Sequence, residues 1–88
     1  MTELKVPATL KLAGVEDCVA SWRQAMTGAD ALQLDISECD SLDFAAIQAV
    51  LSLLAHVEKT GTRLSIHGES PTLSAAMALV GAPLSPAS

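Results

Sequence analysis

The sequence is poor in aromatic residues and in positive charge. Trp22 and Phe44 are the only aromatic residues. The core must therefore be aliphatic and rich in alanine, which suits helices packed closely on a sheet. Five Lys and Arg residues against ten Asp and Glu give a net charge of −5. Because nucleic acids require clustered cations, this balance argues against a nucleic-acid partner, and it gives no reason to expect binding to an anionic membrane surface.

Long apolar runs and catalytic motifs are also missing. No run approaches the ~18 apolar residues of a membrane span, and the N-terminus is too polar for a signal peptide, so we expect a cytoplasmic protein without membrane insertion. Cys18 and Cys39 lack CxxC spacing and are expected to be reduced thiols rather than a disulfide or metal site. There is no phosphate-binding loop and no GxSxG sequence. His56 and His67 fall on different elements. We expect no catalysis, no metal and no cofactor.

Strand-like alternation occurs in three places. The first runs from Leu4 to Ala13, where Leu4, Val6, Ala8, Leu10 and Leu12 share one parity. Pro7 interrupts this run and predicts either two short strands or one bent edge strand, and Gly14 is expected to end it. Residues 31–36 and 62–68 give the second and third strand patterns.

Each strand pattern is followed by a helical one. The first helix is predicted from Val15 to about Thr27, with Glu16 and Asp17 in its first turn and Trp22 in the core. The second is predicted from Asp43, its N-cap, to Lys59, with a buried stripe at Ile47, Val50, Leu51, Leu54 and Val57. The third begins with Ser70 as N-cap and Pro71 at the first position, and Gly81 ends it.

This alternation predicts one α/β domain over residues 1–88, with a frayed tail at 82–88. We expect a central sheet of about four short strands with three or more helices. The strands should be mostly parallel, apart from a mixed edge.

The turn between the second strand and the second helix concentrates negative charge. Asp35, Glu38, Asp40 and Asp43 lie within nine residues of one another. The spacing matches no known cation loop such as the EF-hand, so we favour helix capping and a solvated acidic rim over a Mg²⁺ or Ca²⁺ site. A strand that feeds such a loop and a helix N-terminus suits recognition.

The same stretch resembles the signature of the STAS family, the sulfate transporter and anti-sigma factor antagonist domains. Leu34-Asp35-Ile36-Ser37 match the family's strand end, and Asp43-Phe44-Ala45-Ala46-Ile47 fall on its Asp-Ser-Ser-Gly-Leu positions. Residues 6–12 look like the short N-terminus of stand-alone forms from bacterial signalling and chemotaxis operons. Residues 71–76 look like the family's final helix. The resemblance covers nearly the whole chain and implies a small STAS-like α/β fold.

The resemblance implies a protein-binding module rather than an enzyme. Such antagonists dock this loop and helix onto a partner, often a serine kinase with an ATPase fold like that of histidine kinases, and phosphorylation of the motif's second hydroxyl residue separates the pair. Here that phosphoacceptor position holds Ala45, which has no hydroxyl group, and Phe44 and Ala46 also depart from the pattern. The usual switch should therefore be absent. Ser37 and Ser41 are nearby alternatives, although turn hydrogen bonds explain them more simply.

We therefore predict that loop 37–43 and the following helix bind a regulatory kinase, an anti-sigma factor or a chemotaxis protein. The alternative is a cytoplasmic accessory subunit of a lipid-transporting ABC system, in which related forms commonly carry Thr-Ala-Gly in the motif. Weak nucleotide binding is a third hypothesis, which the local carboxylates oppose. A homodimer is left open. The predicted partner-binding residues are Ser37, Asp40, Ser41, Asp43, Phe44, Ala45, Gln48 and Ser52.

Two details of this surface remain alternatives at the level of sequence. We favour Phe44 buried beneath the loop over Phe44 exposed as a hydrophobic anchor. Ala45 and Ala49, beside Gln48 and Ser52, form a strip of small residues that either admits a partner closely or is simply exposed to solvent. We expect Asp43→Lys to abolish partner binding while the fold survives.

Overall fold

The computed structural model describes residues 2–82 and residue 84. Its elements follow the order β1 (Thr2–Lys5), β2 (Thr9–Leu10), α1 (Leu12–Met26), β3 (Ala31–Asp35), β4 (Ser41–Leu42), α2 (Phe44–Thr60), β5 (Arg63–His67) and α3 (Pro71–Leu79). The predicted α/β class is confirmed, and the strand pattern around Pro7 becomes two short strands.

The main sheet has the strand order β1-β3-β5, and both pairs in it are parallel. Leu4 lies opposite Leu34, and Leu34 lies opposite Ile66, so apolar residues of one parity form a row across the sheet. β2 and β4 form a separate parallel pair. Every strand pair within residues 2–82 is therefore parallel, which confirms the mostly parallel arrangement, and the mixed edge that we expected is not among these pairs.

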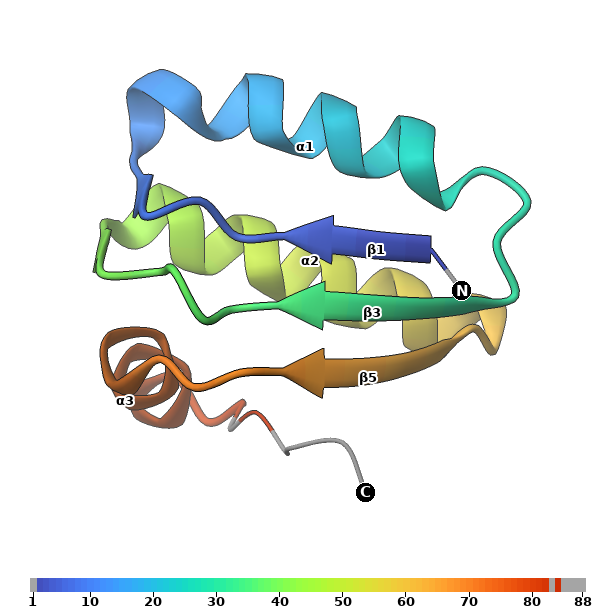
Figure 1. The fold of residues 1–88 in the computed structure, drawn as a ribbon. Helices are drawn as coiled ribbons and strands as arrows, with labels where there is room; N and C mark the ends of the chain where they lie inside the picture. The colour runs from blue at the N-terminus through green and yellow to red at the C-terminus, as the bar shows by residue number, and fades with distance from the viewer. Residues whose placement is uncertain (1, 83, 85–88) are drawn as a thin grey trace.

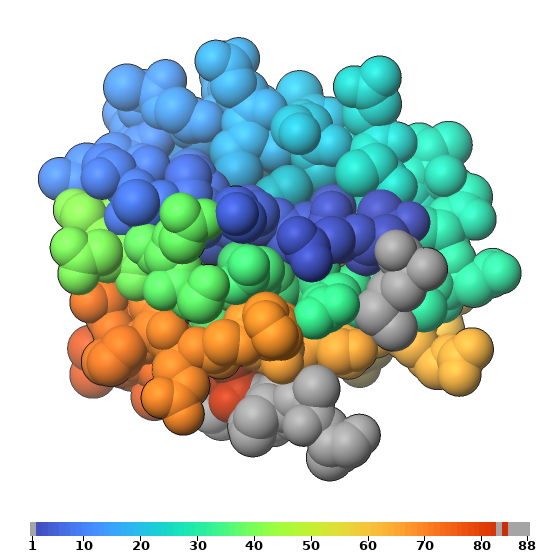
Figure 2. All heavy atoms as spheres, in the orientation of Figure 1, coloured from blue at the N-terminus to red at the C-terminus, as the bar shows by residue number. Residues whose placement is uncertain are grey.

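The helices leave one face of the main sheet open. In Figure 1, α2 lies behind the three strands with α1 beside it, and Figure 2 looks onto the opposite face. Buried Leu4, Leu34 and Ile66 face the helices, whereas Lys5 and His67, of the other parity, are exposed. Trp22 is in the core as predicted, and its Nε1 donates to the Lys5 carbonyl oxygen at 3.1 Å. The core therefore lies between the main sheet and the helices that cover one of its faces.

Helix α1 begins at Leu12 rather than at Val15, which corrects the predicted start. Gly14 lies inside the helix instead of ending a strand, and the first turn contains no acidic residue, so Glu16 and Asp17 lie further along. Leu12 was predicted to share the buried parity of Leu4, but it is 72% exposed. The helix starts early because a residue distant in the sequence caps it at this position.

The other two helices begin and end as predicted, to within about one residue. Asp43 caps α2, and Gly61 ends it in the left-handed conformation at φ 74°. Ser70 caps α3, with Pro71 in its first turn. Ala82 and Leu84 pack against the core. The remainder of the tail that was predicted to fray, residues 83 and 85–88, lies outside the described residues.

None of the helices described is long and apolar enough to cross a membrane.

Candidate functional site

One edge of the molecule collects the ends of the strands and the starts of the helices. β1, β3 and β5 are parallel, so their carboxyl ends lie together, and α1, α2 and α3 begin beside them at the left of Figure 1. Helix N-termini carry partial positive charge and unpaired N–H groups. This edge also contains the acidic loop, so the predicted site is on a surface built by all three strand–helix connections.

The acidic loop is anchored from beneath. Ile36 and Cys39 are buried. The backbone N–H groups of Asp40 and Ser41 both donate to the Ala8 carbonyl oxygen, at 2.9 and 3.0 Å. Buried Ser70 donates from Oγ to the Cys39 carbonyl oxygen at 2.7 Å, and Ser70 Oγ itself accepts from the Leu73 N–H at the start of α3. The loop is therefore fixed to both neighbouring connections by hydrogen bonds within the chain.

Ser37 is positioned by the end of strand β3. Asp35 Oδ1 accepts from the Ser37 N–H at 2.9 Å and from the Ser37 Oγ at 2.6 Å. The bond from the Ser37 hydroxyl is the main reason that the Asp35 pKa lies below its usual value. Gly68 approaches Ser37 so closely that a Cβ added to Gly68 would lie 2.6 Å from the Ser37 Cβ. Glycine at position 68 is therefore a requirement of the loop.

Gly14→Ala and Gly68→Ala are expected to change stability in opposite directions. Gly14 lies inside α1 with open space around its missing side chain, so alanine should stabilise the fold by about 0.5–1 kcal/mol. Gly68 has φ +85° and meets Ser37, so alanine should destabilise it by about 1–3 kcal/mol. Urea denaturation of both variants measures the two effects. A destabilising Gly14→Ala would contradict the early start of α1.

Asp43 caps two helices at once. In the β2–β4 pair Leu10 lies opposite Leu42, so the next residue, Asp43, comes beside the start of α1. Asp43 Oδ2 accepts from the Leu12 N–H at 2.9 Å, and Oδ1 accepts from the Ala46 N–H in α2 at 3.1 Å. Lys11, the N-cap residue of α1, forms no capping bond with its side chain. We call this arrangement the Asp43 double cap.

The double cap accounts for the electrostatics of Asp43 and for the start of α1. The hydrogen bond from Leu12 is the largest cause of a lowered Asp43 pKa, and bonds from the first turn of α2 add to it. The carboxylate satisfies an N–H group in each helix that has no partner within its own helix. Asp43→Lys would remove both caps. A loss of binding in that variant could therefore arise from a disturbed fold, so it does not locate an interface.

The residues predicted to bind a partner differ in how accessible they are. Phe44 is 65% exposed, so the burial that we favoured is wrong. Ala49 is buried, which breaks the predicted strip of small residues. Ser52 lies further along α2, where it lines a groove with His56. The exposed residues are Ser37, Asp40, Phe44, Gln48 and Ser52, and the half-buried ones are Ser41, Asp43 and Ala45.

Leu12 is a surface residue that the sequence analysis missed. It is the first residue of α1, and Phe44 is the first residue of α2. Asp43 joins these two helix starts through its bond to the Leu12 N–H. The edge therefore exposes one large apolar side chain at each of the two helix starts. In the sequence, Leu12 shares the parity of Leu4 and Leu10, and this pattern was interpreted as that of a strand.

Lys5 and Glu38 form an ion pair at this edge. Lys5 Nζ lies 2.8 Å from Glu38 Oε2, and both side chains are about half exposed, so the pair contributes little stability. Within the described ranges, no three His, Cys, Asp or Glu side chains converge as metal ligands would. The edge therefore combines a fixed acidic loop with exposed apolar side chains at two helix starts.

Comparison with protein families matches residues 2–83 to a family model described as "Mlab, STAS domain". Comparisons with curated proteins and with solved structures give no match. STAS domains are generally non-catalytic. The match spans nearly the whole chain and includes every strand and helix described above. The chain belongs to the STAS domain family.

Proposed function

We propose that this chain is a non-catalytic, cytoplasmic interaction module like an anti-sigma factor antagonist. It binds a regulatory kinase, an anti-sigma factor or a chemotaxis protein through loop 37–43 and the start of α2. Binding is constitutive, because the position that related proteins phosphorylate holds Ala45. The observation that carries the proposal is Phe44, which is exposed at a helix start whose loop and cap are already fixed.

The loop is already ordered in the free protein, which favours binding. A segment that must become ordered on binding loses affinity to conformational entropy. Here the loop is attached to Ala8 and Ser70 by hydrogen bonds, and Asp43 fixes the start of α2. Aromatic side chains are frequent among the residues that dominate binding energy at protein interfaces. Phe44 is thus presented to a partner at little further entropic cost.

The hydroxyl groups near Ala45 are poor substitutes for a phosphoacceptor. Ser37 Oγ lies 2.6 Å from the carboxylate oxygen of Asp35, where an added phosphate would meet a like charge. Ser41 is half-buried in β4, where it pairs with Thr9. Both serines are therefore placed for structural roles, which supports binding without a phosphorylation switch at this edge.

An accessory subunit of a lipid-transporting ABC system is the second candidate. It is favoured by Ala45, since the forms that serve such transporters commonly have alanine at this position. In this case the same edge would contact the nucleotide-binding subunit of the transporter. The two candidates share a surface and differ in the class of ATPase that binds to it.

Restoring the missing hydroxyl separates the two candidates. The tagged wild-type chain is used to capture its partner, which is identified by mass spectrometry. The captured protein is then incubated with labelled ATP and either wild type or Ala45→Ser. For a signalling kinase we expect no phosphate on the wild type and clear incorporation into Ala45→Ser.

The double variant Ala45→Ser/Ser41→Ala is the control and should keep its label, because the new hydroxyl is the acceptor. Phosphate on the wild type would contradict constitutive binding. Capture of a transporter ATPase, with no label on either protein, would favour the accessory subunit.

A further inference from the structure

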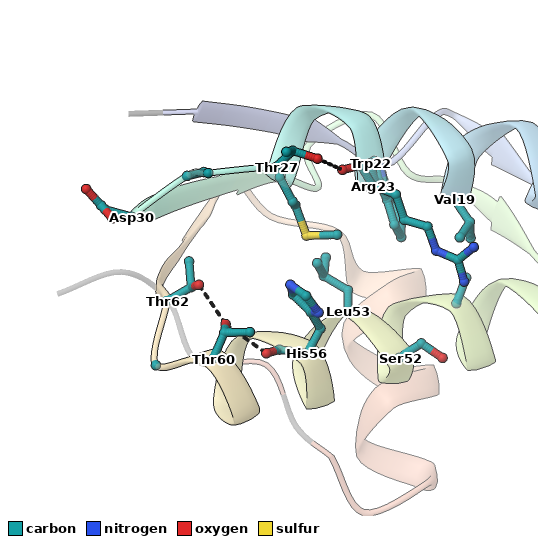
Figure 3. Close-up of a pocket in the computed structure, with 15 residues that line it drawn as sticks. Val19, Trp22, Arg23, Thr27, Asp30, Ser52, Leu53, His56, Thr60 and Thr62 are labelled. Carbon is teal, nitrogen blue, oxygen red and sulfur yellow. Dashed lines mark hydrogen bonds between the residues drawn. The ribbon is translucent and has the colours of Figure 1, made fainter.

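A groove lies between α1 and α2, away from the edge described above. It is lined by the second half of α1, by α2 from Ala49 onward, and by the turns that lead into β3 and β5. Its volume is about 750 Å³, within the range of small-molecule sites. Figure 3 shows side chains from both helices converging on it. The helix starts at Leu12 and Phe44 are not part of its lining, so the proposed interface leaves it unoccupied.

The groove exists because α2 presents small side chains to α1 at this point. Ala49 and Ser52 face the gap, and Trp22 and Leu53 form its buried apolar base. The Trp22 indole N–H already donates to the Lys5 carbonyl oxygen, so the ring has no further polar group to offer. Water in such a groove finds few hydrogen-bond partners at the base, and an apolar group that replaces it is favoured.

The polar groups of the groove are mostly basic or already satisfied. Arg23 extends from α1 between Val19 and Ser52, and the His56 ring points into the groove from α2 (Figure 3). Arg23 forms no ion pair with any of residues 2–82. Thr27 and Thr60 donate their hydroxyl hydrogens to carbonyl oxygens of their own helices. Asp30, the one carboxylate in the lining, points away (Figure 3).

We propose that this groove binds a small amphipathic carboxylate. The Arg23 guanidinium pairs with the carboxylate, and His56 offers a second polar contact. The apolar body of the ligand lies over Trp22 and Leu53. An anionic ligand is favoured because Arg23 has no ion-pair partner among residues 2–82 and Asp30, the only carboxylate in the lining, points away from the groove (Figure 3). The apolar base favours a ligand that also has an apolar body. This ligand site is separate from the partner surface of the proposed function.

Trp22 makes the proposal directly measurable, because it is the only tryptophan in the chain. The probe is decanoate, kept below its micelle concentration, with binding followed by tryptophan fluorescence and by calorimetry. Decanol and decyltrimethylammonium are the neutral and cationic comparisons. We expect decanoate to bind about tenfold more tightly than either, the difference that one charge-assisted contact gives. A titration with neither a fluorescence change nor heat overturns the proposal, as does equal binding of the cationic probe.

Substitutions in the lining test the charged contact and the apolar contact separately. Arg23→Gln should weaken decanoate about tenfold and leave decanol unchanged, because only the charged contact is lost. Ala49→Leu should weaken both probes by filling the groove. If Ala49→Leu fails to fold, Ser52→Leu should have the same effect on both probes, because Ser52 lies at an exposed position of the lining. Lys59→Gln removes one positive charge from α2 outside the lining and should change neither affinity. A loss of decanoate affinity in Lys59→Gln equal to that in Arg23→Gln would mean unspecific charge attraction and would overturn the site.

Discussion

Asp43→Ala should lower the thermal unfolding midpoint by about 10 °C, roughly twice the effect of losing a single N-cap. The reason is the Asp43 double cap, in which one carboxylate accepts from Leu12 in α1 and from Ala46 in α2. Without it, both helices begin with an unpaired N–H group, and Lys11 offers α1 no replacement. Circular dichroism during heating measures the midpoint.

Asp43→Asn provides a graded comparison. An amide has one acceptor oxygen, and its nitrogen is a donor, so asparagine can cap only one of the two helices. Its midpoint should lie between those of wild type and Asp43→Ala. Asp40→Ala is the matched control, since Asp40 is an exposed carboxylate of the same loop whose side chain forms no hydrogen bond within the described residues. Equal midpoints for Asp43→Ala and Asp40→Ala would contradict the double cap.

The double cap also gives stability a dependence on pH. The Asp43 pKa is lowered in the folded protein, chiefly by the bond from Leu12, so folding favours the ionised form. This contribution is complete above the unfolded-state pKa of about 4, and it disappears as the pH falls through the lower folded-state pKa. Wild type should therefore lose more stability than Asp43→Ala between pH 5 and about pH 3. Asp35, whose pKa is lowered by Ser37, contributes with the same sign in both proteins.

The start of a helix could be predicted from the sequence wherever the capping residue directly precedes that helix. Asp43 and Ser70 each accept from an N–H group three residues later, and both were identified from residue type and position. The start of α1 could not be found in this way. Its cap is Asp43, which lies 31 residues from Leu12 in the sequence and is brought beside it only by the β2–β4 pairing. Leu12 was therefore assigned to a strand.

The exposure of the individual residues in the candidate site could not be predicted from the sequence. The acidic loop and the helix after it were identified from charge clustering and from the family resemblance. Burial of Phe44 beneath the loop was favoured over its exposure as a hydrophobic anchor. The structure fills the space behind the loop with Ile36, Cys39 and Ala46 instead, and Phe44 is left outside. The rotation of a helix about its axis decides which of its apolar residues enter the core. The mixed pattern of Phe and Ala at the start of α2 does not determine that rotation.

Phe44→Glu should weaken binding of the captured partner at least about 30-fold, the loss typical of a dominant interface residue. Phe44 is exposed in the free protein, and a glutamate in the first turn complements the helix dipole, so the thermal midpoint should change little. Calorimetry with the purified partner measures the affinity. Phe44→Ala separates the loss of apolar contact from the added charge, and it should retain part of the effect.

Leu79→Glu is the matched control for this variant. Leu79 is 88% exposed at the end of α3, so the substitution adds the same charge to another exposed apolar position, at the opposite end of α3 from the loop contact of Ser70. Its affinity should remain within about twofold of wild type, as expected for a residue outside the group that dominates binding. If Leu79→Glu weakens binding and Phe44→Glu does not, the partner binds near the end of α3. The acidic loop would then serve only to fix the helix starts, because its hydrogen bonds to Ala8, Ser70 and Leu12 would explain its sequence without a partner.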